Sequence, residues 1–417
     1  MLQRGKHSLK GAVLVALALV AGACTSTGNG QFGQGAPRPP QASTAPAVPP
    51  PVTPPVAQVE LPRPLKAAWA HLFSDDLKTQ AGLDRVLDDA ASSGLNAVFV
   101  QVVRRHDAYY RSEVLPPTPD PALDPGFDVL AAAVAGGRAR GLQVHAWFTV
   151  ATAWHESYRG LDLPAGHVTR EHGPGTADPW MTVSASGTQS REYFDIGLTE
   201  LQDHVAGVVA DIAGRYDVDG VHLDYVRYDG AQWGYHPRAL ERFRAETGHQ
   251  GTPAASDPGW TAWKREQSRT IVERARGALA GTRPGALLSA AVIAQQAGPS
   301  ASPGGFSGTR AYADYAQDWA AWVSDGLVDL AVPMVYMREA VAEHAGWFRQ
   351  WLAFASELDQ GPGAVATGIG GWLNPVDASL VQARLALEHT AGVAVFSYQQ
   401  DTSNARHGTL LRELATL

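Results

Sequence analysis

The sequence has a single cysteine, Cys24, among 417 residues, and only 18% of its residues are charged. One cysteine cannot form an intramolecular disulfide, so the fold must be held by its hydrophobic core. Basic residues are not in excess either, because 33 Lys and Arg stand against 41 Asp and Glu. A nucleic-acid-binding protein needs a basic face to neutralise phosphates, and we therefore expect no nucleic-acid partner.

Motifs that define several other enzyme classes are also missing. No GxGxxG turn follows an expected strand, and no GxSxG elbow occurs, which argues against a dinucleotide-binding enzyme and a Ser-His-Asp hydrolase. Neither HExxH nor HxH is found. A zinc site made by His71, His145, His222 and Asp224 is an alternative, but hydrogen-bonded active-site histidines are commoner. We expect no metal and no cofactor.

Residues 1–23 read as an export signal. Three basic residues precede an apolar run from Gly11 to Val20, which is too short for a permanent membrane span. Cys24 follows Ala21-Gly22-Ala23, and this arrangement resembles a bacterial lipobox, whose cysteine is acylated and becomes the first residue of the mature chain. Ala21 stands where a lipobox usually has Leu, so ordinary secretion is the alternative. We expect an exported lipoprotein, anchored to a membrane at the cell envelope through Cys24.

Residues 24–64 are rich in Pro, Gly, Ala, Ser, Thr and Gln. Such a segment cannot bury a core, and we expect an extended, semi-rigid tether. The composition changes after Leu65, where apolar and aromatic residues become frequent. We therefore expect one catalytic domain over residues 65–417.

In this domain, short hydrophobic runs alternate eight times with longer amphipathic stretches. Continuous apolar runs are typical of parallel strands covered on both faces. The alternation predicts an α/β fold, a single (β/α)8 TIM barrel with long βα loops at 151–196 and 227–259. The expected strands are 66–71, 95–103, 142–150, 220–226, 286–293, 327–336, 363–372 and 392–399. The expected helices are 79–93, 128–140, 199–216, 260–279, 312–324, 344–358, 378–389 and one from about residue 404.

The fourth expected strand carries the strongest catalytic candidate. A TIM barrel binds its substrate at the C-terminal ends of its strands. Asp224 lies at such an end and shares a face with His222 by the strand's period of two. Carboxylates supply the acid, base or nucleophile of glycoside hydrolysis, so Asp224 is the expected principal catalytic group. The alternative is an ion pair of Asp224 with Arg227 or Arg104 that only positions a loop.

A second catalytic carboxylate is expected at Glu339 or Asp401, each at the end of a later strand. An N-acetyl group of the substrate is an alternative nucleophile, in which case one well-placed acid suffices. Asp219 is expected to serve a turn. Aromatic rings stack on the apolar faces of sugars. The expected substrate-binding residues are Gln101, Asp107, His145, Trp147, His222, Arg227, Tyr336, Trp372 and Tyr398.

Six segments between residues 66 and 400 resemble the bacterial glycosyl hydrolase-like family 10. The clearest are His145-Ala146-Trp147-Phe148 and the Asp-Val-Asp-Gly-Val-His-Leu-Asp run of 217–224. The chain departs from the family pattern at Tyr225, where a second aspartate is common. The resemblance implies an exported TIM-barrel hydrolase of a cell-wall polysaccharide, namely peptide-free peptidoglycan strands, with Asp224 in its site. A non-catalytic glycan-binding barrel and an amylase-like hydrolase of other α-glucans are the alternatives.

Overall fold

The computed structural model describes residues 58–153, 162–398 and 405–417. The chain divides into two units, Met1–Pro54 and Pro55–Leu417, and every described residue belongs to the second. The expected signal peptide, Cys24 and most of the expected linker lie outside the described residues, as does Asp401. Among the residues that are described, none of the helices is both long and apolar enough to cross a membrane.

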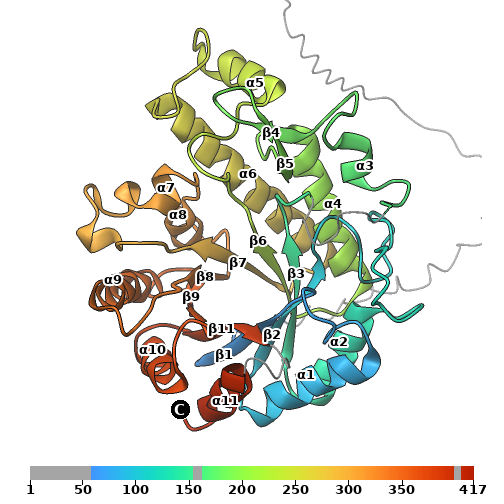
Figure 1. Cartoon of the computed structure of the whole chain (residues 1–417), viewed down its shortest axis with the longest axis vertical. Helices are drawn as coiled ribbons and strands as arrows, with labels where there is room; N and C mark the ends of the chain where they lie inside the picture. The colour runs from blue at the N-terminus through green and yellow to red at the C-terminus, as the bar shows by residue number, and fades with distance from the viewer. Residues whose placement is uncertain (1–57, 154–161, 399–404) are drawn as a thin grey trace, which may run out of the picture. The chain divides into compact units, whose positions relative to one another are not determined.

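Eight parallel strands in the described part of the chain close into a barrel (Figure 1). The seventh is interrupted, and its second half pairs with both neighbours, at Gly368 with Met334 on one side. This closure confirms the predicted (β/α)8 fold. The strands are β1 (Leu65–Ala70), β2 (Ala97–Val103), β3 (Gln143–Thr149), β6 (Gly220–Asp224), β7 (Leu287–Ile293), β8 (Leu330–Met334), β9 (Ala364–Val365) with β10 (Thr367–Gly370), and β11 (Gly392–Tyr398).

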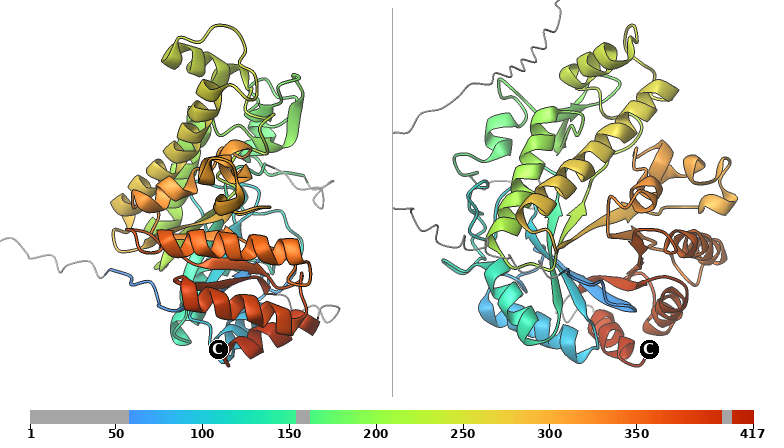
Figure 2. Two further views of the ribbon diagram at one scale, coloured as in Figure 1. Left: turned by 90° about the vertical axis from the view of Figure 1, so that its left-hand side faces the viewer. Right: turned by 180° about the vertical axis from the view of Figure 1, so that it is seen from behind.

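Helices surround the strands, as Figure 1 and the reverse view in Figure 2 show. The expected helix at 312–324 is wrong as a single element, because Ala316 adopts a positive φ of 50° that interrupts it. The remaining expected helices are found within a few residues of their predicted ends. The helices are α1 (Gln80–Ser92), α2 (Val129–Ala139), α4 (Thr199–Arg215), α6 (Pro258–Thr282), α7 (Arg310–Ala313), α8 (Trp319–Ser324), α9 (Ala342–Leu358), α10 (Val376–His389) and α11 (Ala405–Leu414).

Both predicted long loops contain structure of their own. The connection after β3 holds α3 (Val168–His172) and a hairpin of β4 (Met181–Val183) and β5 (Gln189–Phe194). The connection after β6 holds α5 (Pro237–Thr247), and the one after β7 has the short turns η2 (Pro299–Ala301) and η3 (Gly305–Gly308). A separate small core of Tyr235, Ala239, Phe243, Trp260 and Trp263 lies at α5 and the start of α6. The hairpin and α5 lie together in the upper part of Figure 1.

The barrel interior contains a chain of buried polar groups. The indole N–H of Trp69 donates to His222 Nε2 at 3.0 Å, so the other imidazole nitrogen carries the proton and donates to Ser289 Oγ at 2.9 Å. Ser289 Oγ lies 3.3 Å from His145 Nδ1. Burial lowers the pKa of His145 to about 4 and that of His222 well below its ordinary value. Both histidines are therefore neutral structural groups that Phe99 also contacts.

The opposite end of the barrel is joined by side chains that precede the strands. Asn96, Asp219, Asp329 and Asp359 each accept a hydrogen bond from a backbone N–H of a neighbouring or following strand, at 2.7–2.9 Å. Asp219 is thus a strand-joining residue rather than a site residue. These bonds satisfy backbone N–H groups near the beginnings of the strands.

The residues that directly precede β1 contact the barrel. Val59 N donates to Gly285 O at 2.9 Å, and Gln143 donates to the carbonyl of Glu60 at 2.7 Å. Leu61 packs against the interior cluster that contains Leu65 and Trp69. Residues 58–64 were expected to belong to the linker, so the folded domain begins earlier than composition predicted. The high proline content of this segment had indicated a linker, although Val59, Glu60 and Leu61 contact the barrel.

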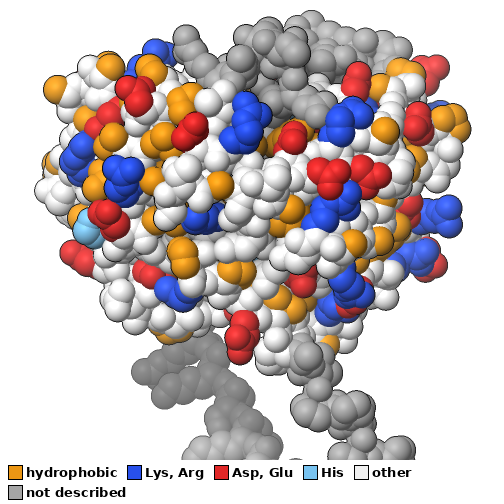
Figure 3. Space-filling model, turned by 90° about the horizontal axis from the view of Figure 1, so that it is seen from below, with side chains coloured by type: hydrophobic (Ala, Val, Ile, Leu, Met, Phe, Trp, Pro, Cys, Tyr) orange, Lys and Arg blue, Asp and Glu red, His pale blue; other side chains and the backbone are white. Residues whose placement is uncertain are grey.

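The face shown in Figure 3 carries charged side chains of both signs, interspersed with single apolar ones. Many of the surface charges are paired, for example Arg140 with Asp84 and Asp88, and Arg349 with Glu339. Exposed pairs of this kind contribute little to stability. The fold therefore depends on its core and its polar interior.

A substitution at Gly220 tests the interior packing. A Cβ at this position would lie 2.5 Å from His145 Nδ1 and 2.7 Å from the carbonyl oxygen of Leu287. We expect Gly220→Ala to lower the free energy of unfolding by about 1–3 kcal/mol, measured by urea denaturation. The control is Gly277→Ala on the exposed face of α6, where a Cβ meets no atom within 4 Å. That variant should be about 0.5–1 kcal/mol more stable than the parent. Equal stabilities of the two variants would contradict the packing.

Candidate active site

A cavity of 300 Å³ opens at the C-terminal ends of the strands, where a TIM barrel binds its substrate. Its wall is formed by strand ends and by the loops that follow them. Two carboxylates, Asp224 and Glu192, belong to the wall. The lining residues are Phe73, Gln101, Arg104, Arg105, Trp147, Thr149, Thr152, Glu192, Tyr193, Asp224, Tyr225, Arg227, Met334, Tyr336 and Phe396.

Asp224 is the last residue of β6 and is only 5% exposed. Its Oδ1 accepts hydrogen bonds from the backbone N–H of Tyr225 at 2.7 Å and from Arg227 Nη1 at 3.3 Å. Burial raises the pKa of the Asp224 carboxyl, while Arg227, the Tyr225 N–H and the Trp147 side chain act in the opposite direction. The result is a buried carboxyl that is more basic than an ordinary aspartate.

Tyr225 adopts a strained backbone conformation beside this carboxylate. Its φ is 56°, in the left-handed region that a bulky side chain rarely occupies. Such a conformation costs about 1–3 kcal/mol and persists only where the surroundings enforce it. The Arg227 guanidinium lies 3.7 Å over the Tyr225 ring, and the Tyr193 ring lies nearly parallel to it at 6.2 Å. The strained backbone of Tyr225 thus lies in a wall of the cavity where the side chains of Tyr193, Tyr225 and Arg227 stack.

Another wall of the cavity is formed by the ends of β8 and β11. Tyr336, two residues after β8, contacts Phe396 of β11 at 5.9 Å and Trp372 at 5.1 Å between ring centroids. Burial, with Asp224 as a second cause, raises the pKa of Tyr336 well above its ordinary value. Trp372 is 40% exposed and is not part of the cavity lining, so it lies beside the mouth rather than within it.

The hairpin after β3 brings Glu192 and Tyr193 to the cavity. Tyr193 of β5 bridges to Thr152, and the carbonyl of Glu192 accepts from Ala153 N at 2.8 Å. The backbone of β5 therefore runs alongside the segment that leaves β3. Glu192 is exposed, in contrast to the buried Asp224. One carboxylate of the cavity is open to solvent and the other is enclosed.

Asp195 holds the hairpin in place. It is fully buried, and its carboxylate accepts hydrogen bonds from Thr182 Oγ1 at 3.0 Å, Gly197 N at 2.9 Å and His236 N at 3.3 Å. These donors come from β4, from the approach to α4 and from the start of α5. Burial raises the pKa of Asp195 despite this support. Asp195, which directly follows the strand that carries Glu192, thus joins that strand to His236, the residue before α5, and to Gly197, two residues before α4.

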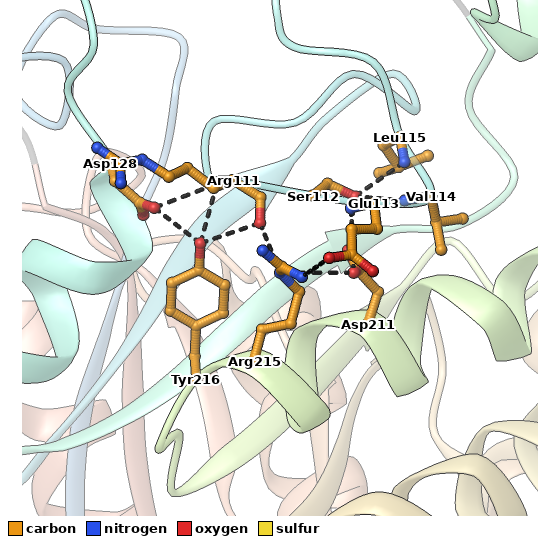
Figure 4. A network of polar contacts seen from close by, with 9 residues as sticks. All are labelled: Arg111, Ser112, Glu113, Val114, Leu115, Asp128, Asp211, Arg215 and Tyr216. Carbon is orange, nitrogen blue, oxygen red and sulfur yellow. Dashed lines mark hydrogen bonds and ion pairs between the residues drawn. The ribbon is translucent and has the colours of Figure 1, made fainter.

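The loop after β2 is anchored to α4 by the polar network of Figure 4. Ser112 Oγ and Glu113 N both donate to Asp211, at 2.5 and 3.2 Å. Tyr216 donates to Asp128 at 2.7 Å, and Arg215 Nε to the carbonyl of Arg111 at 2.9 Å. This loop begins with Arg104 and Arg105, which line the cavity. The network therefore fixes the side of the mouth that carries those two arginines.

Five of the sequence-predicted site residues meet at the cavity. They are Asp224, Gln101, Trp147, Arg227 and Tyr336. Gln101 is buried there, and both ends of its amide are engaged: it accepts from Leu72 N at 3.0 Å and donates to Thr149 at 2.9 Å. Gln101 thus fixes the wall. Trp147 lies beside Asp224, and the hydrogen bond from its side chain lowers the pKa of that carboxyl.

Three predicted residues lie within the protein and away from the cavity lining. His145 and His222 belong to the barrel interior. His222 lies one inward position below Asp224 on β6, and His145 is in register with Gly220, two inward positions below Asp224. Asp107 is fully buried and accepts from Arg105 at 3.0 Å, so it supports an arginine of the cavity wall. His145 and His222 lie within β3 and β6 rather than at their C-terminal ends, and Asp107 follows β2 by four residues, so these side chains contribute to the site only indirectly.

Glu339, which the sequence suggested as a second catalytic carboxylate, does not line the cavity. Its carboxylate accepts from Arg349 at 2.7 Å and from Gln382 at 3.0 Å, which hold it against α9 and α10. Asp401, the other predicted partner, lies outside the described residues, as does Cys24. The described carboxylate that shares the cavity with Asp224 is Glu192.

Tyr398 points away from the cavity as well. Its hydroxyl donates to Asp89 of α1 at 2.7 Å. The pairing of β11 with β1 shifts register after Phe396, because Trp69 pairs with Phe396 and Ala70 with Tyr398. This shift removes Tyr398 from the inward face that a regular period of two would give it. Phe396, which the sequence did not single out, takes the place at the cavity.

Other cavity residues that the sequence analysis missed differ in how far their role could have been predicted from the sequence. Thr149 continues the inward face of β3 after Trp147, so period two could have found it. Glu192 and Tyr193 lie 43 and 44 residues after that strand, and only the length of the connection hinted at their role. No sequence motif indicates which side chains of a hairpin inserted into a long loop will lie at the mouth of the barrel.

Comparison with known proteins identifies relatives. Residues 64–369 match the model of the family described as "Glycosyl hydrolase-like 10". The chain is 26% identical over 350 residues to the glycosyl hydrolase DigH of Escherichia coli (strain K12), covering 78% of this chain and 74% of the relative. It is 25% identical over 298 residues to the glycosyl hydrolase YngK of Bacillus subtilis (strain 168), covering 67% of this chain and 56% of that relative's length.

Solved structures share the fold. The glycoside hydrolase domain of PgaB (BpsB) from Bordetella bronchiseptica superposes with a TM-score of 0.62 at 15% identity, covering 84% of this chain and 98% of that one. The catalytic domain of a β-amylase from Paenibacillus polymyxa gives 0.57 at 12% identity, covering 82% and 97%. The family match and the named relatives support a glycoside hydrolase, and the chain belongs to the glycosyl hydrolase-like 10 family.

Proposed function

We propose that this protein is an exported glycoside hydrolase that cleaves glycosidic bonds in a cell-wall polysaccharide, peptide-free peptidoglycan strands being the preferred candidate. The observation that supports this most is the cavity at the strand ends, which contains a buried carboxyl, Asp224, and an exposed one, Glu192. Glycosidases use two carboxyl groups on either side of the bond they cleave. The family membership of the chain agrees with this chemistry.

The two carboxyl groups have environments that suit different tasks. Asp224 is enclosed and held by Arg227 and the Tyr225 N–H, so its charge can stabilise the positive anomeric carbon as the bond breaks. Glu192 lies at the rim, where it can exchange a proton with the leaving oxygen or with water. We therefore assign Asp224 to the anomeric centre and Glu192, in place of Glu339, to acid-base catalysis.

The proposed substrate requires the domain to act outside the cytoplasm. Residues 1–23 have the pattern of an export signal, and Cys24 follows it directly. We propose that acylation of Cys24 anchors the protein to a membrane at the cell envelope and that the Pro-rich segment lets the domain reach the glycan. The proposed partners of the protein are therefore a polysaccharide substrate and this membrane.

Substitution of the two carboxylates tests the catalytic assignment. We expect Asp224→Asn and Glu192→Gln each to lower the release of reducing ends from amidase-stripped peptidoglycan by roughly 10²- to 10⁴-fold. Asp224→Asn should also lower the free energy of unfolding, because it leaves the buried Arg227 guanidinium without its ion-pair partner.

The matched control is Glu241→Gln on the exposed face of α5, outside the cavity lining. It should retain the parent's rate. Full activity of either cavity variant would contradict its assigned role. A parent protein that binds stripped strands and releases no product would favour a glycan-binding barrel, and product from soluble α-glucans alone would favour the amylase-like alternative.

The pH dependence of kcat/KM tests the environment of Asp224. Burial raises the pKa of this carboxyl above its ordinary value of 3.8, and Arg227 opposes the rise. Activity that needs the ionised form is present above the raised pKa and is lost as pH falls through it. Arg227→Gln removes the favourable cation, so the acidic limb should move upward by about one pH unit.

Arg238→Gln is the control for this measurement. Arg238 is a surface residue that pairs with Glu200 and Asp178, outside the cavity lining. Its substitution should leave the acidic limb where the parent has it. Superimposable profiles for Arg227→Gln and the parent would show that Asp224 does not set this limb.

Cell fractionation tests the anchor. We expect the parent in the membrane fraction and Cys24→Ser in the soluble exported fraction, because the serine hydroxyl cannot take the place of the acylated thiol. The intact mass of the parent should include the lipid. A parent that is soluble and unmodified would establish ordinary secretion instead.

A further inference from the structure

Two imidazoles join α4 to the end of β3, behind the wall of the cavity. His106 is fully buried in the loop after β2, where its φ of 67° lies in the left-handed region. Its Nε2 lies 2.8 Å from the carbonyl oxygen of Val150, and its Nδ1 lies 3.1 Å from Nε2 of His204 on α4. Arg105 and Thr149, each next to a residue of this chain of contacts, line the cavity.

The hydrogen bonds of the two imidazoles fit one distribution of protons. A carbonyl oxygen only accepts, so Nε2 of His106 has a proton and donates to Val150. In a neutral imidazole the other nitrogen is an acceptor, and Nδ1 of His106 therefore accepts from the Nε2–H of His204. A second proton on His106 would occupy Nδ1 and place two N–H donors against each other. The bond between the two histidines thus requires a neutral His106.

Aromatic rings of the insertion after β3 cover this pair. Phe194 of β5 contacts the His106 ring edge to face, at 5.2 Å between ring centroids. Trp180, directly before β4, contacts the His204 ring at 6.3 Å and Phe194 at 6.5 Å. Glu192 lies two residues before Phe194 on the same strand. The inserted hairpin of β4 and β5, which brings Glu192 to the cavity, therefore packs on neutral imidazoles.

The titratable groups around the pair come from α3, from its N-cap and from the loop after β2. They are His167, His172, Glu171, Arg105 and Asp107. Arg105 and Asp107 are paired with each other at 3.0 Å. Within the described part of the chain, no carboxylate forms a hydrogen bond with His106 or His204. A positive charge on either imidazole would therefore be buried without a partner, which is costly.

The pKa values give the direction of the pH dependence. Burial lowers the pKa of His106 well below its ordinary value and lowers the pKa of His204 and of His167 to about 4. Rings that return to water when the hairpin opens regain a pKa of about 6.5. The open form thus binds protons that the closed form does not, and the closed form loses stability as pH falls from about 6.5 toward 4. Asp195 acts in the opposite direction, because burial raises its pKa in the closed form.

We propose that the His106–His204 pair is an acid-sensitive switch that holds the inserted hairpin against the barrel. In neutral surroundings the pair keeps Glu192 and Tyr193 at the cavity, and in acidic surroundings protonation of the imidazoles releases the hairpin. The consequence for hydrolysis rests on the proposed function, because Glu192 leaves the cavity with the hairpin. The opening itself does not depend on that function.

Hydrogen exchange followed by mass spectrometry tests the switch in the parent protein. Each histidine that binds a proton on opening increases the opening equilibrium constant by up to about tenfold per pH unit. We expect the protection factors of peptides from residues 180–195, corrected for intrinsic exchange, to fall at least about tenfold between pH 7 and pH 5. Peptides that cover β7 should remain protected at both pH values. Return to pH 7 should restore the protection of the hairpin.

His204→Gln separates the imidazole pair from other groups that titrate in acid. The amide N–H of glutamine can donate to Nδ1 of His106, but this side chain does not titrate. We expect protection of the hairpin at pH 7 to equal that of the parent, and its loss at pH 5 to be about tenfold smaller. The matched control is His389→Gln at the exposed end of α10, which should behave as the parent does. Thermal unfolding at pH 7 establishes that each variant is folded.

The outcomes separate the switch from the proposed function. Hairpin protection that is equal at pH 7 and pH 5 in the parent overturns the switch, and so does loss of protection in the hairpin and β7 together, which is acid unfolding of the barrel. An unchanged pH dependence in His204→Gln overturns the assignment to this pair. Because no substrate is present, selective opening in acid supports the switch even if the protein hydrolyses no glycan, a result that would overturn the hydrolase alone.

Discussion

The burial of the Asp224 carboxylate is the constraint around which the cavity is organised. A charge removed from water must be compensated, and here the Arg227 guanidinium and the Tyr225 N–H both reach the same oxygen. The N–H of Tyr225 reaches this oxygen while the Tyr225 backbone occupies the left-handed region, a conformation that costs energy for a bulky residue. Arg227 in turn covers the Tyr225 ring. The groups that compensate the charge of Asp224 therefore also form the wall of the cavity in which Arg227 stacks on Tyr225.

This arrangement needs a rigid base, which the interior of the barrel supplies. The Trp69–His222–Ser289 bonds run directly beneath Asp224, since His222 and Asp224 are two residues apart on β6. Neutral imidazoles fit here better than charged ones because burial lowers the pKa of both histidines. Gly220, one inward position below His222 on β6, leaves room for the ring of His145. The three consecutive inward positions of β6 thus have different roles: Gly220 leaves space, His222 supports the layer above, and Asp224 lines the cavity.

The sequence predicted those features that follow from local periodicity. Eight hydrophobic runs predicted the barrel, and the period of two on β3 and β6 brought Trp147 and Asp224 to its mouth. The failures have non-local causes. Tyr398 leaves the inward face through a register shift, Glu339 is held by Arg349 and Gln382 from two later helices, and Glu192 arrives on a hairpin inserted between two barrel units. No pattern within a strand records pairing shifts, distant ion pairs or the return path of a long loop.

The cavity therefore combines two kinds of sequence with different constraints. Asp224, Trp147 and Tyr336 project from barrel strands or their immediate ends, and any change in their positions would disturb the packing of the barrel itself. Glu192 and Tyr193 belong to a hairpin whose attachment depends on the buried Asp195 and on a few backbone contacts with residues 151–153. A hairpin fixed at one carboxylate can change its exposed residues without cost to the barrel. The position of Asp224 is thus set by the barrel, whereas Glu192 and the outer wall of the cavity depend on the hairpin and can vary independently of it.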